Sequence, residues 1–269
     1  EILNDVSPGE AVIVDEKGRL FRKQCTKMNR HRPCLFEFVY FSRPDSTIDS
    51  ISVHKSRLRM GDFLGEKILN QYNHLKIDVV IPIPDTSRTS AMQVAYKLSA
   101  KYREGFIKNR YIGRTFIMPG QGVRKRSVAH KLSPIEIEFK GKNVLLVDDS
   151  IVRGNTSKKI IEMVRKNGAK RVYFASASPP IRFQNVYGID MPATSELVAH
   201  NRSTSEIKKY INADELIYQD IKDLKLSASI GNPQITHFED SVFTGKYCTN
   251  GVTKQFLNKL ENERNDDKR

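Results

Sequence analysis

Two adjacent carboxylates, Asp148 and Asp149, directly follow an apolar run, and a short turn containing Gly154 comes next. The run reads as a strand buried on both faces. Ligands of open α/β sheets collect at the carboxyl ends of such strands. After the turn, small hydroxyl residues open a helix that is predicted to reach about Asn167. The free backbone N–H groups at such a helix start suit a phosphate.

The carboxylates need a different partner, because they repel phosphate. Sugar hydroxyls donate hydrogen bonds to carboxylates, and Mg²⁺ prefers oxygen ligands. The pattern therefore predicts a ligand with a phosphate at one end and a metal-bound sugar in the middle. The alternative is that Asp148, Asp149 and Ser150 only cap the next helix. A single cap would suffice and neighbouring acids repel each other, so we favour the ligand.

A second strand, loop and helix repeats this arrangement. Residues 77–81 read as a buried strand that Pro82 and Pro84 end. Loops after parallel strands share one edge of a sheet, so Thr86 and Ser87 are predicted to lie near Asp148. Their hydroxyl and N–H groups suit pyrophosphate, although an ordinary helix cap remains the alternative. The inward face of the following helix is predicted to carry Ala91, Met92, Ala95 and Leu98.

The segment between Gly105 and Ile135 contains no acidic residue. Pro119, Gly120 and Gly122 interrupt regular structure, which predicts a flexible basic loop. A solvated charged face is the simpler interpretation, yet aromatic and aliphatic residues lie within the segment as well. A loop that folds over an anionic ligand uses both kinds of side chain. The basic residues are Lys108, Arg110, Arg114, Arg124, Lys125, Arg126 and Lys131.

The central motif resembles the phosphoribosyl-pyrophosphate (PRPP) binding motif of type I phosphoribosyltransferases. The amino-acid sequence of residues 144–157 and 185–190 is similar to that of the amidophosphoribosyltransferases, the glutamine–PRPP amidotransferases that catalyse the first step of purine synthesis. Residues 82–87 and 108–121 match the same family. The likeness covers nearly the whole chain, with several motifs in the right order.

This resemblance implies that ammonia attacks the ribose carbon of PRPP and that pyrophosphate leaves. It places Asp148 and Asp149 on the ribose hydroxyls and Mg²⁺, with Thr86 as a further metal ligand. Thr86, Ser87 and Arg88 face the pyrophosphate in this assignment, and Lys108, Tyr111 and Arg114 close over it. The 5′-phosphate is assigned to Ser150, Ile151, Val152, Arg153, Gly154, Asn155, Thr156 and Ser157. The family usually has threonine where Asn155 stands.

Alternating strands and helices predict an α/β fold with a mostly parallel sheet flanked by helices. By resemblance, residues 35–252 form the phosphoribosyltransferase domain and residues 253–269 a C-terminal helix and tail. Residues 1–34 are interpreted as the last β-hairpin of an upstream glutaminase domain of the Ntn type. The nucleophilic N-terminal cysteine of that domain is absent from this chain. The aromatic residues 35–41 read as a strand.

The formal charge of +14 favours an anionic partner: a polyphosphate, nucleic acid or an anionic membrane. The basic loop beside the acid pair favours the sugar phosphate, so we expect neither nucleic acid nor membrane as a partner. A nucleobase salvage phosphoribosyltransferase and a PRPP-sensing regulator that binds nucleic acid remain the alternatives. By resemblance, a homotetramer and feedback inhibition by purine nucleotides are expected.

Three cysteines without metal-ligand spacing fit a reducing, cytoplasmic setting. Some relatives in the family hold an iron–sulfur cluster. Asn185, Glu239 and Val242 stand where most of its ligands would be, so no cluster is expected here.

Overall fold

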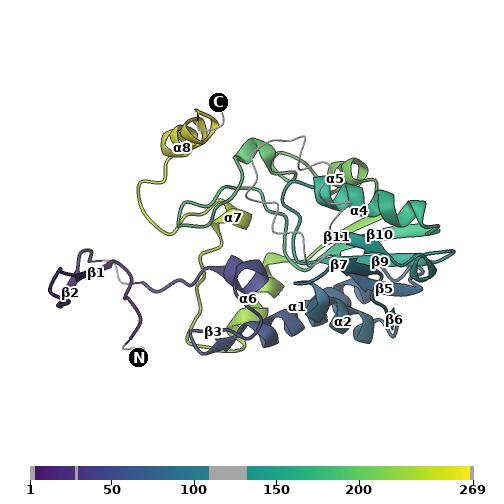
Figure 1. Ribbon diagram of the computed structural model, residues 1–269, viewed down its shortest axis with the longest axis horizontal. Helices are drawn as coiled ribbons and strands as arrows, with labels where there is room; N and C mark the ends of the chain where they lie inside the picture. The colour runs from purple at the N-terminus through teal and green to yellow at the C-terminus, as the bar shows by residue number, and fades with distance from the viewer. Residues whose placement is uncertain (1–3, 28–29, 109–131, 267–269) are drawn as a thin grey trace.

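The computed structural model describes residues 4–27, 30–108 and 132–266, and the structural statements below refer to these residues. Its central sheet has five parallel strands in the order β6-β5-β9-β10-β11 (Figure 1). At the centre of the sheet, Leu145 of β9 lies opposite Val80 of β5 and Tyr173 of β10. The predicted α/β class with a mostly parallel sheet is confirmed. The strands are Lys101–Tyr102 (β6), Val79–Pro82 (β5), Asn143–Asp148 (β9), Arg171–Ser176 (β10) and Glu215–Tyr218 (β11).

The strand order places a topological switch between β5 and β9. From β5 the chain continues to β6 on one side, whereas β9, β10 and β11 follow on the other side. The chain leaves β5 toward the face covered by α2 (Arg88–Lys97) and leaves β9 toward the opposite face, covered by α4 (Asn155–Lys166). Open α/β sheets bind ligands at such a point, and the site at the carboxyl ends of these two strands is called the crevice below. Both predicted ligand-binding loops follow these strands.

Helices cover both faces of the sheet, and β9 carries apolar side chains on both of its faces. Leu145 and Val147 belong to one core, which also contains residues of α1, α2 and α6. Val144 and Leu146 belong to the second core, with residues of α4 and α5. All four side chains are fully buried, as the period-two alternation of a strand requires. The helices are Val53–Gln71 (α1), Arg88–Lys97 (α2), Asn155–Lys166 (α4), Thr204–Ile211 (α5) and Ile221–Ser229 (α6).

Two glycines one turn apart bring α1 close to α2. A Cβ atom on Gly61 would lie 2.4 Å from the carbonyl oxygen of Ser90, and one on Gly65 would lie 2.7 Å from Cβ of Lys97. The Ser90 hydroxyl also donates a hydrogen bond of 2.9 Å to the carbonyl of Arg57. Backbone-to-backbone contact thus fixes α1 against the helix that follows β5.

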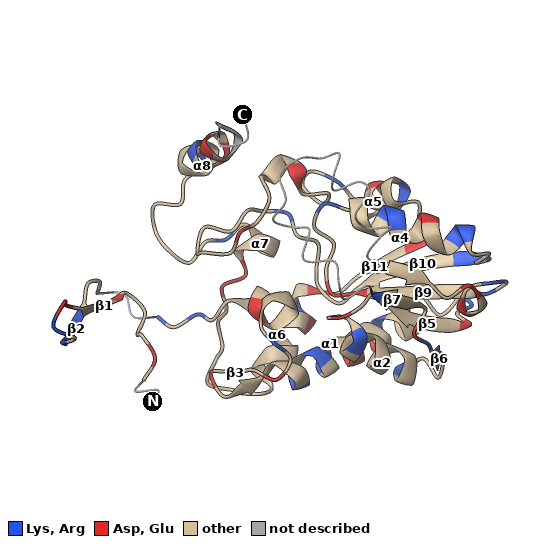
Figure 2. Ribbon diagram, viewed as in Figure 1, with Lys and Arg blue, Asp and Glu red and all other residues tan. Residues whose placement is uncertain are grey.

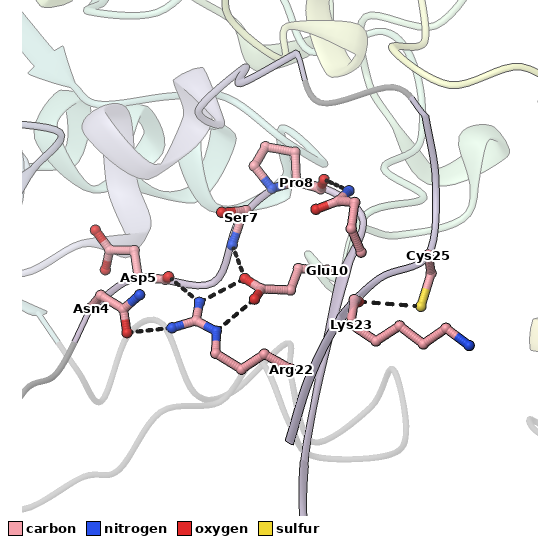
Figure 3. Close-up of polar contacts among 9 residues, drawn as sticks. Asn4, Asp5, Ser7, Pro8, Glu10, Arg22, Lys23 and Cys25 are labelled. Carbon is pink, nitrogen blue, oxygen red and sulfur yellow. Dashed lines mark hydrogen bonds and ion pairs between the residues drawn. The ribbon is translucent and has the colours of Figure 1, made fainter. Parts of the chain in front are cut away.

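The N-terminal hairpin pairs β1 (Glu10–Val14) with β2 (Leu20–Gln24) in antiparallel register. Arg22 binds both carboxylate oxygens of Glu10, at 2.5 and 2.6 Å, and donates to the carbonyl of Asp5 (Figure 3). The hydrogen bond from Arg22 holds the pKa of Glu10 down, at about 2. Figure 1 shows the hairpin apart from the sheet. The predicted hairpin is confirmed, and its origin in an upstream domain stays a prediction.

Shorter elements complete the described structure. A capping box begins α5: the Ser203 hydroxyl accepts from the N–H of Glu206, whose carboxylate accepts from the N–H of Ser203. None of the helices in the described ranges is long and apolar enough to cross a membrane. The remaining elements are η1 (Glu37–Phe41), β3 (Thr47–Ile48), β4 (Ile51–Ser52), β7 (Phe106–Lys108), β8 (Leu132–Pro134), η3 (Glu136–Glu138), η4 (Thr194–Glu196), α7 (Ser241–Thr244) and α8 (Lys254–Asp266).

Two expectations about local structure are wrong. Residues 35–41 are helical rather than extended, and Glu37–Phe41 form the π-helical turn η1, because tertiary packing buries Phe38 and Val39 and overrides their β-propensity. Met92 of α2 is 47% exposed instead of facing inward, whereas Ala91 and Ala95 are buried as expected. Small residues face α1 here, since the close approach of the two helices leaves no room for a longer side chain.

Candidate functional site

The crevice between β5 and β9 brings together residues from both predicted loops. Asp148 is the last residue of β9, and Asp149 follows it. The Thr86 side chain, from the loop after β5, lies near enough to Asp149 to lower the pKa of its carboxyl group. The predicted proximity of the two loops is therefore confirmed. It arises because the two strands are hydrogen-bonded neighbours that end at the same edge of the sheet.

The two carboxylates are half-buried and close together. The N–H of Asp149 donates to Oδ1 of Asp148 at 2.9 Å, and the Ser150 hydroxyl donates to Oδ1 of Asp149 at 2.6 Å. Burial and the Asp149 charge raise the pKa of Asp148 well above its ordinary value. Burial also raises the pKa of Asp149 to about 6, although Ser150 and a nearby arginine, Arg57, oppose the shift. A desolvated acid pair of this kind gains from a cation.

Arg57 is a site residue that the sequence analysis missed. It lies on α1, is 3% exposed, and lowers the pKa of Asp149 through its charge. Its Nε donates to the carbonyl of Phe38 at 3.0 Å, and its Nη2 donates to the carbonyl of Ser42 at 2.8 Å. Only the phase of the α1 periodicity carried a signal: the arginine falls on the buried face of this helix. The structure thus supplies the acid pair with a fixed buried cation.

The cations predicted to face pyrophosphate meet on Asp85. Lys108, at the end of β7, forms an ion pair with Asp85, and Nη1 of Arg88 lies 3.1 Å from the same carboxylate. Arg88 also contacts Glu104 at 3.2 Å. The Lys108 and Arg88 side chains are about half exposed, at 44% and 45%. No sequence motif singled out Asp85, yet its carboxylate contacts both cations.

Ser87 is placed differently from a free hydroxyl ligand. Its side chain is fully buried, and its hydroxyl donates to the carbonyl of Ile83. Any contact of Ser87 with a ligand would therefore use its backbone N–H. The Pro84–Asp85 peptide bond in the same loop is cis.

The loop from Ser150 to Ser157 combines buried and exposed positions. Gly154 has φ of 72°, in the left-handed region that favours glycine, and it precedes the first residue of α4. Ile151 and Ser157 are buried, which leaves their backbone to face a ligand, whereas Asn155 and Thr156 are exposed. The Val152 carbonyl accepts from the N–H of Val198 at 2.9 Å, and Arg153 forms an ion pair of 2.7 Å with Glu196.

The basic loop is only partly described. Its two ends are held side by side, because β7 pairs with β8 in antiparallel register from Phe106–Pro134 to Lys108–Leu132. Tyr111 and Arg114 lie outside the described residues, as does the rest of segment 109–131. Their assigned roles, and the predicted flexibility of the loop, stay predictions.

Comparison with known protein families identifies one domain within the chain. The phosphoribosyl transferase domain family matches residues 48–178, which contain both loops of the crevice. Residues 48–178 form a phosphoribosyl transferase domain. Its fold is that of a type I phosphoribosyltransferase, as the sequence analysis predicted, and its five-stranded parallel sheet is the core of that domain.

The similarity of this chain to known proteins extends beyond the matched domain. The chain is 57% identical to an amidophosphoribosyltransferase of Pseudomonas aeruginosa over 265 residues, 98% of this chain and 53% of the relative. It is 56% identical to that of Escherichia coli and 52% identical to that of Saccharomyces cerevisiae, over 99% and 97% of this chain and 53% and 51% of those proteins. The chain thus spans about half the length of the curated relatives it matches.

A solved structure of an amidotransferase is also similar to this chain. The glutamine phosphoribosylpyrophosphate amidotransferase of B. subtilis, complexed with ADP and GMP, aligns with a TM-score of 0.77 and 37% identity. The alignment covers 94% of this chain and 54% of that chain. The resemblance to amidophosphoribosyltransferases drawn from the sequence motifs is confirmed.

Proposed function

We propose that this chain transfers ammonia to PRPP in the first step of purine synthesis. The ammonia lone pair forms a bond to C1 of the ribose, the bond from C1 to the pyrophosphate oxygen breaks, and pyrophosphate leaves with the electron pair. Loss of one proton from nitrogen gives 5-phosphoribosylamine. Bond breaking places positive charge on the sugar ring, as in glycoside chemistry. The protein then has to orient the reactants, neutralise the leaving group and exclude water.

One observation carries the proposal: an acid pair and a glycine-started helix lie at the switch point of the parallel sheet. Asp148 and Asp149 can accept hydrogen bonds from ribose hydroxyls, and Thr86 lies beside them. The N–H groups after Gly154 point along the start of α4, where the 5′-phosphate would bind. The similarity to amidophosphoribosyltransferases over nearly the whole chain favours ammonia over a nucleobase as the nucleophile.

Mg²⁺ fits the acid pair. In the described ranges no three His, Cys, Asp or Glu side chains are grouped to hold a metal by themselves. Mg²⁺ is commonly bound by one or two carboxylates together with the phosphates of a substrate. Asp148, Asp149 and Thr86 provide that partial oxygen set. Burial raises the pKa of both acids, and a bound cation would favour their charged forms. Bound Mg²⁺ would neutralise negative charge on the leaving pyrophosphate.

Lys108 and Arg88 are the described cations for the pyrophosphate. Both are half-exposed and both contact Asp85, while Arg88 also contacts Glu104. A pyrophosphate that binds there would therefore compete with these carboxylates for the two cations. Phosphate oxygens accept charge-assisted hydrogen bonds from such groups. In the same proposal, Tyr111 and Arg114 of the basic loop close over the substrate.

The proposal includes partners that the full-length relatives suggest. A glutaminase half would supply ammonia from glutamine, and the chain would work in the cytoplasm as a homotetramer. Purine nucleotides are proposed as inhibitors, since the similar B. subtilis structure is a complex with ADP and GMP.

Two of the positions compared with iron–sulfur ligands, Asn185 and Glu239, are buried, and the Asn185 amide donates a hydrogen bond of 3.4 Å to the Glu239 carboxylate. The expected lack of an iron–sulfur cluster stays a prediction, as does the lack of nucleic-acid and membrane partners.

The test is pyrophosphate release by the 269-residue chain with Mg²⁺ and PRPP. We expect turnover with ammonia and none with glutamine alone. Replacing both acids (Asp148→Asn with Asp149→Asn) should abolish turnover and leave the fold intact, whereas the control Asp223→Asn on α6 should retain it. Mg²⁺-dependent turnover in the double variant would refute the assignment.

Two further arms of this test address the alternatives. Release that requires a nucleobase instead of ammonia would identify a salvage enzyme. Steeply salt-dependent nucleic-acid binding without any turnover would identify a regulator.

A further inference from the structure

A tyrosine from α5 contacts the side chain of Asn155 in the phosphate loop, residues 150–157. The Tyr210 hydroxyl donates a hydrogen bond of 2.6 Å to Oδ1 of Asn155, the first residue of α4. An asparagine amide has one acceptor oxygen and one NH₂ donor group. Because the oxygen accepts from Tyr210, the orientation of the amide is fixed, and the NH₂ group is the end that can donate to an anion.

The Tyr210 ring also supports the loop backbone. A Cβ atom on Gly154 would lie 3.1 Å from Cε1 of Tyr210 and 3.0 Å from Cγ2 of Val198. Val198 is itself hydrogen-bonded to the loop, since its N–H donates to the carbonyl of Val152 at 2.9 Å. The loop therefore contacts Tyr210 at two successive residues: the backbone of Gly154 and the side chain of Asn155.

Two cations gather on the same ring. Nζ of Lys158 lies 5.5 Å from the Tyr210 ring centroid, and Cζ of Arg202 lies 5.6 Å from it. Figure 2 shows further Lys and Arg residues along α4 and α5. A lysine in the first turns of a helix is opposed by the helix dipole, and a bound anion at the helix start offsets that repulsion. The ring thus keeps positive charge close to the loop.

We propose that Tyr210 is a positioning residue for the 5′-phosphate of the sugar substrate. Its hydroxyl orients the Asn155 amide so that the NH₂ group donates to a phosphate oxygen, and its ring holds Gly154 and Lys158 in place for the same anion. This inference rests on the proposed function of the loop. It assigns Asn155 a side-chain role that the motif itself left open.

The test measures binding of two fragments of PRPP by calorimetry. Ribose 5-phosphate probes the phosphate loop, and inorganic pyrophosphate probes the Asp85 end of the crevice. Tyr210→Phe removes the hydroxyl and keeps the ring, so it should weaken ribose 5-phosphate binding roughly three- to tenfold, the effect of one hydrogen bond. Pyrophosphate binding should not change. The matched control is Tyr96→Phe, since Tyr96 on α2 is 78% exposed.

A double-mutant cycle separates positioning from direct contact. Tyr210→Phe should have no further effect once Asn155→Ala is present, because the hydroxyl then has no amide to orient. Independent losses in the two variants would overturn the proposal, as would an equal loss for both fragments or no loss at all. If the parent chain binds neither fragment, the proposed function fails, and this inference fails with it.

Discussion

Replacement of Arg57 by methionine tests whether a buried cation holds the site together. Arg57 is 3% exposed and donates to two backbone carbonyls, those of Phe38 and Ser42. Methionine keeps an unbranched apolar stem but leaves both carbonyls without this donor. It also removes the positive charge that lowers the pKa of Asp149. We therefore expect a loss of stability together with a further rise in the pKa of Asp149.

The expected loss follows from the two hydrogen bonds. A hydrogen bond to a charged group contributes about 1.5–3 kcal/mol, which gives a gross loss of roughly 3–6 kcal/mol. Burial lowers the pKa of the Arg57 guanidinium, which shows that burying this charge costs free energy in the parent chain. Replacement by methionine removes that cost, so the net loss of stability is smaller than the gross loss. A net decrease of about 2–4 kcal/mol in the free energy of unfolding remains. For a chain of this size, that corresponds to a fall in Tm of roughly 4–16 °C.

Thermal and urea denaturation at neutral pH measure the effect. The matched control is Arg59→Met, because Arg59 lies on the same helix and donates to a single carbonyl, that of Ser227, at 3.1 Å. Arg57→Lys retains the charge but not the two-armed donor, so it should fall between parent and Arg57→Met. If Arg57→Met melts no lower than Arg59→Met, the anchoring role derived from the two carbonyl contacts is refuted.

Three further predictions concern other parts of the molecule. Asp85→Asn should strengthen pyrophosphate binding a few-fold, because it releases Lys108 and removes one of the two carboxylates that hold Arg88; weaker binding in calorimetry would contradict this. Gly154→Ala should cost about 1–2 kcal/mol in the left-handed region, in addition to its contacts with Val198 and Tyr210, and denaturation together with ribose 5-phosphate binding will measure it. Burial and Glu239 raise the pKa of Cys34 to about 12, so this thiol stays protonated at pH 8. Iodoacetamide should therefore label the exposed Cys25 first, and Cys34 only after unfolding; equal rates in mass spectrometry would argue against this burial.

Much of the fold could be predicted because its signals are local. The apolar run into Asp148 and Asp149 predicts a strand buried on both faces, and β9 is that strand. The capping box at Ser203 and the glycine before α4 also follow from short-range backbone chemistry. The π-helical turn at residues 37–41 could not be predicted, since its aromatic residues favour strands and only long-range packing selects the turn.

The residue types of the site can be read from the amino-acid sequence: paired acids, a glycine turn and hydroxyls after two strands. Which side chains surround them follows from the tertiary structure. Lys108 and Asp85 are 23 residues apart, and Tyr210 and Asn155 are 55 residues apart, so no local pattern links either pair. Arg57 lowers the pKa of Asp149 from α1, a helix that is far from Asp149 in the sequence and packs on the sheet beside α2. The physical reason is that distant contacts depend on how helices and strands pack, which short-range periodicity does not encode.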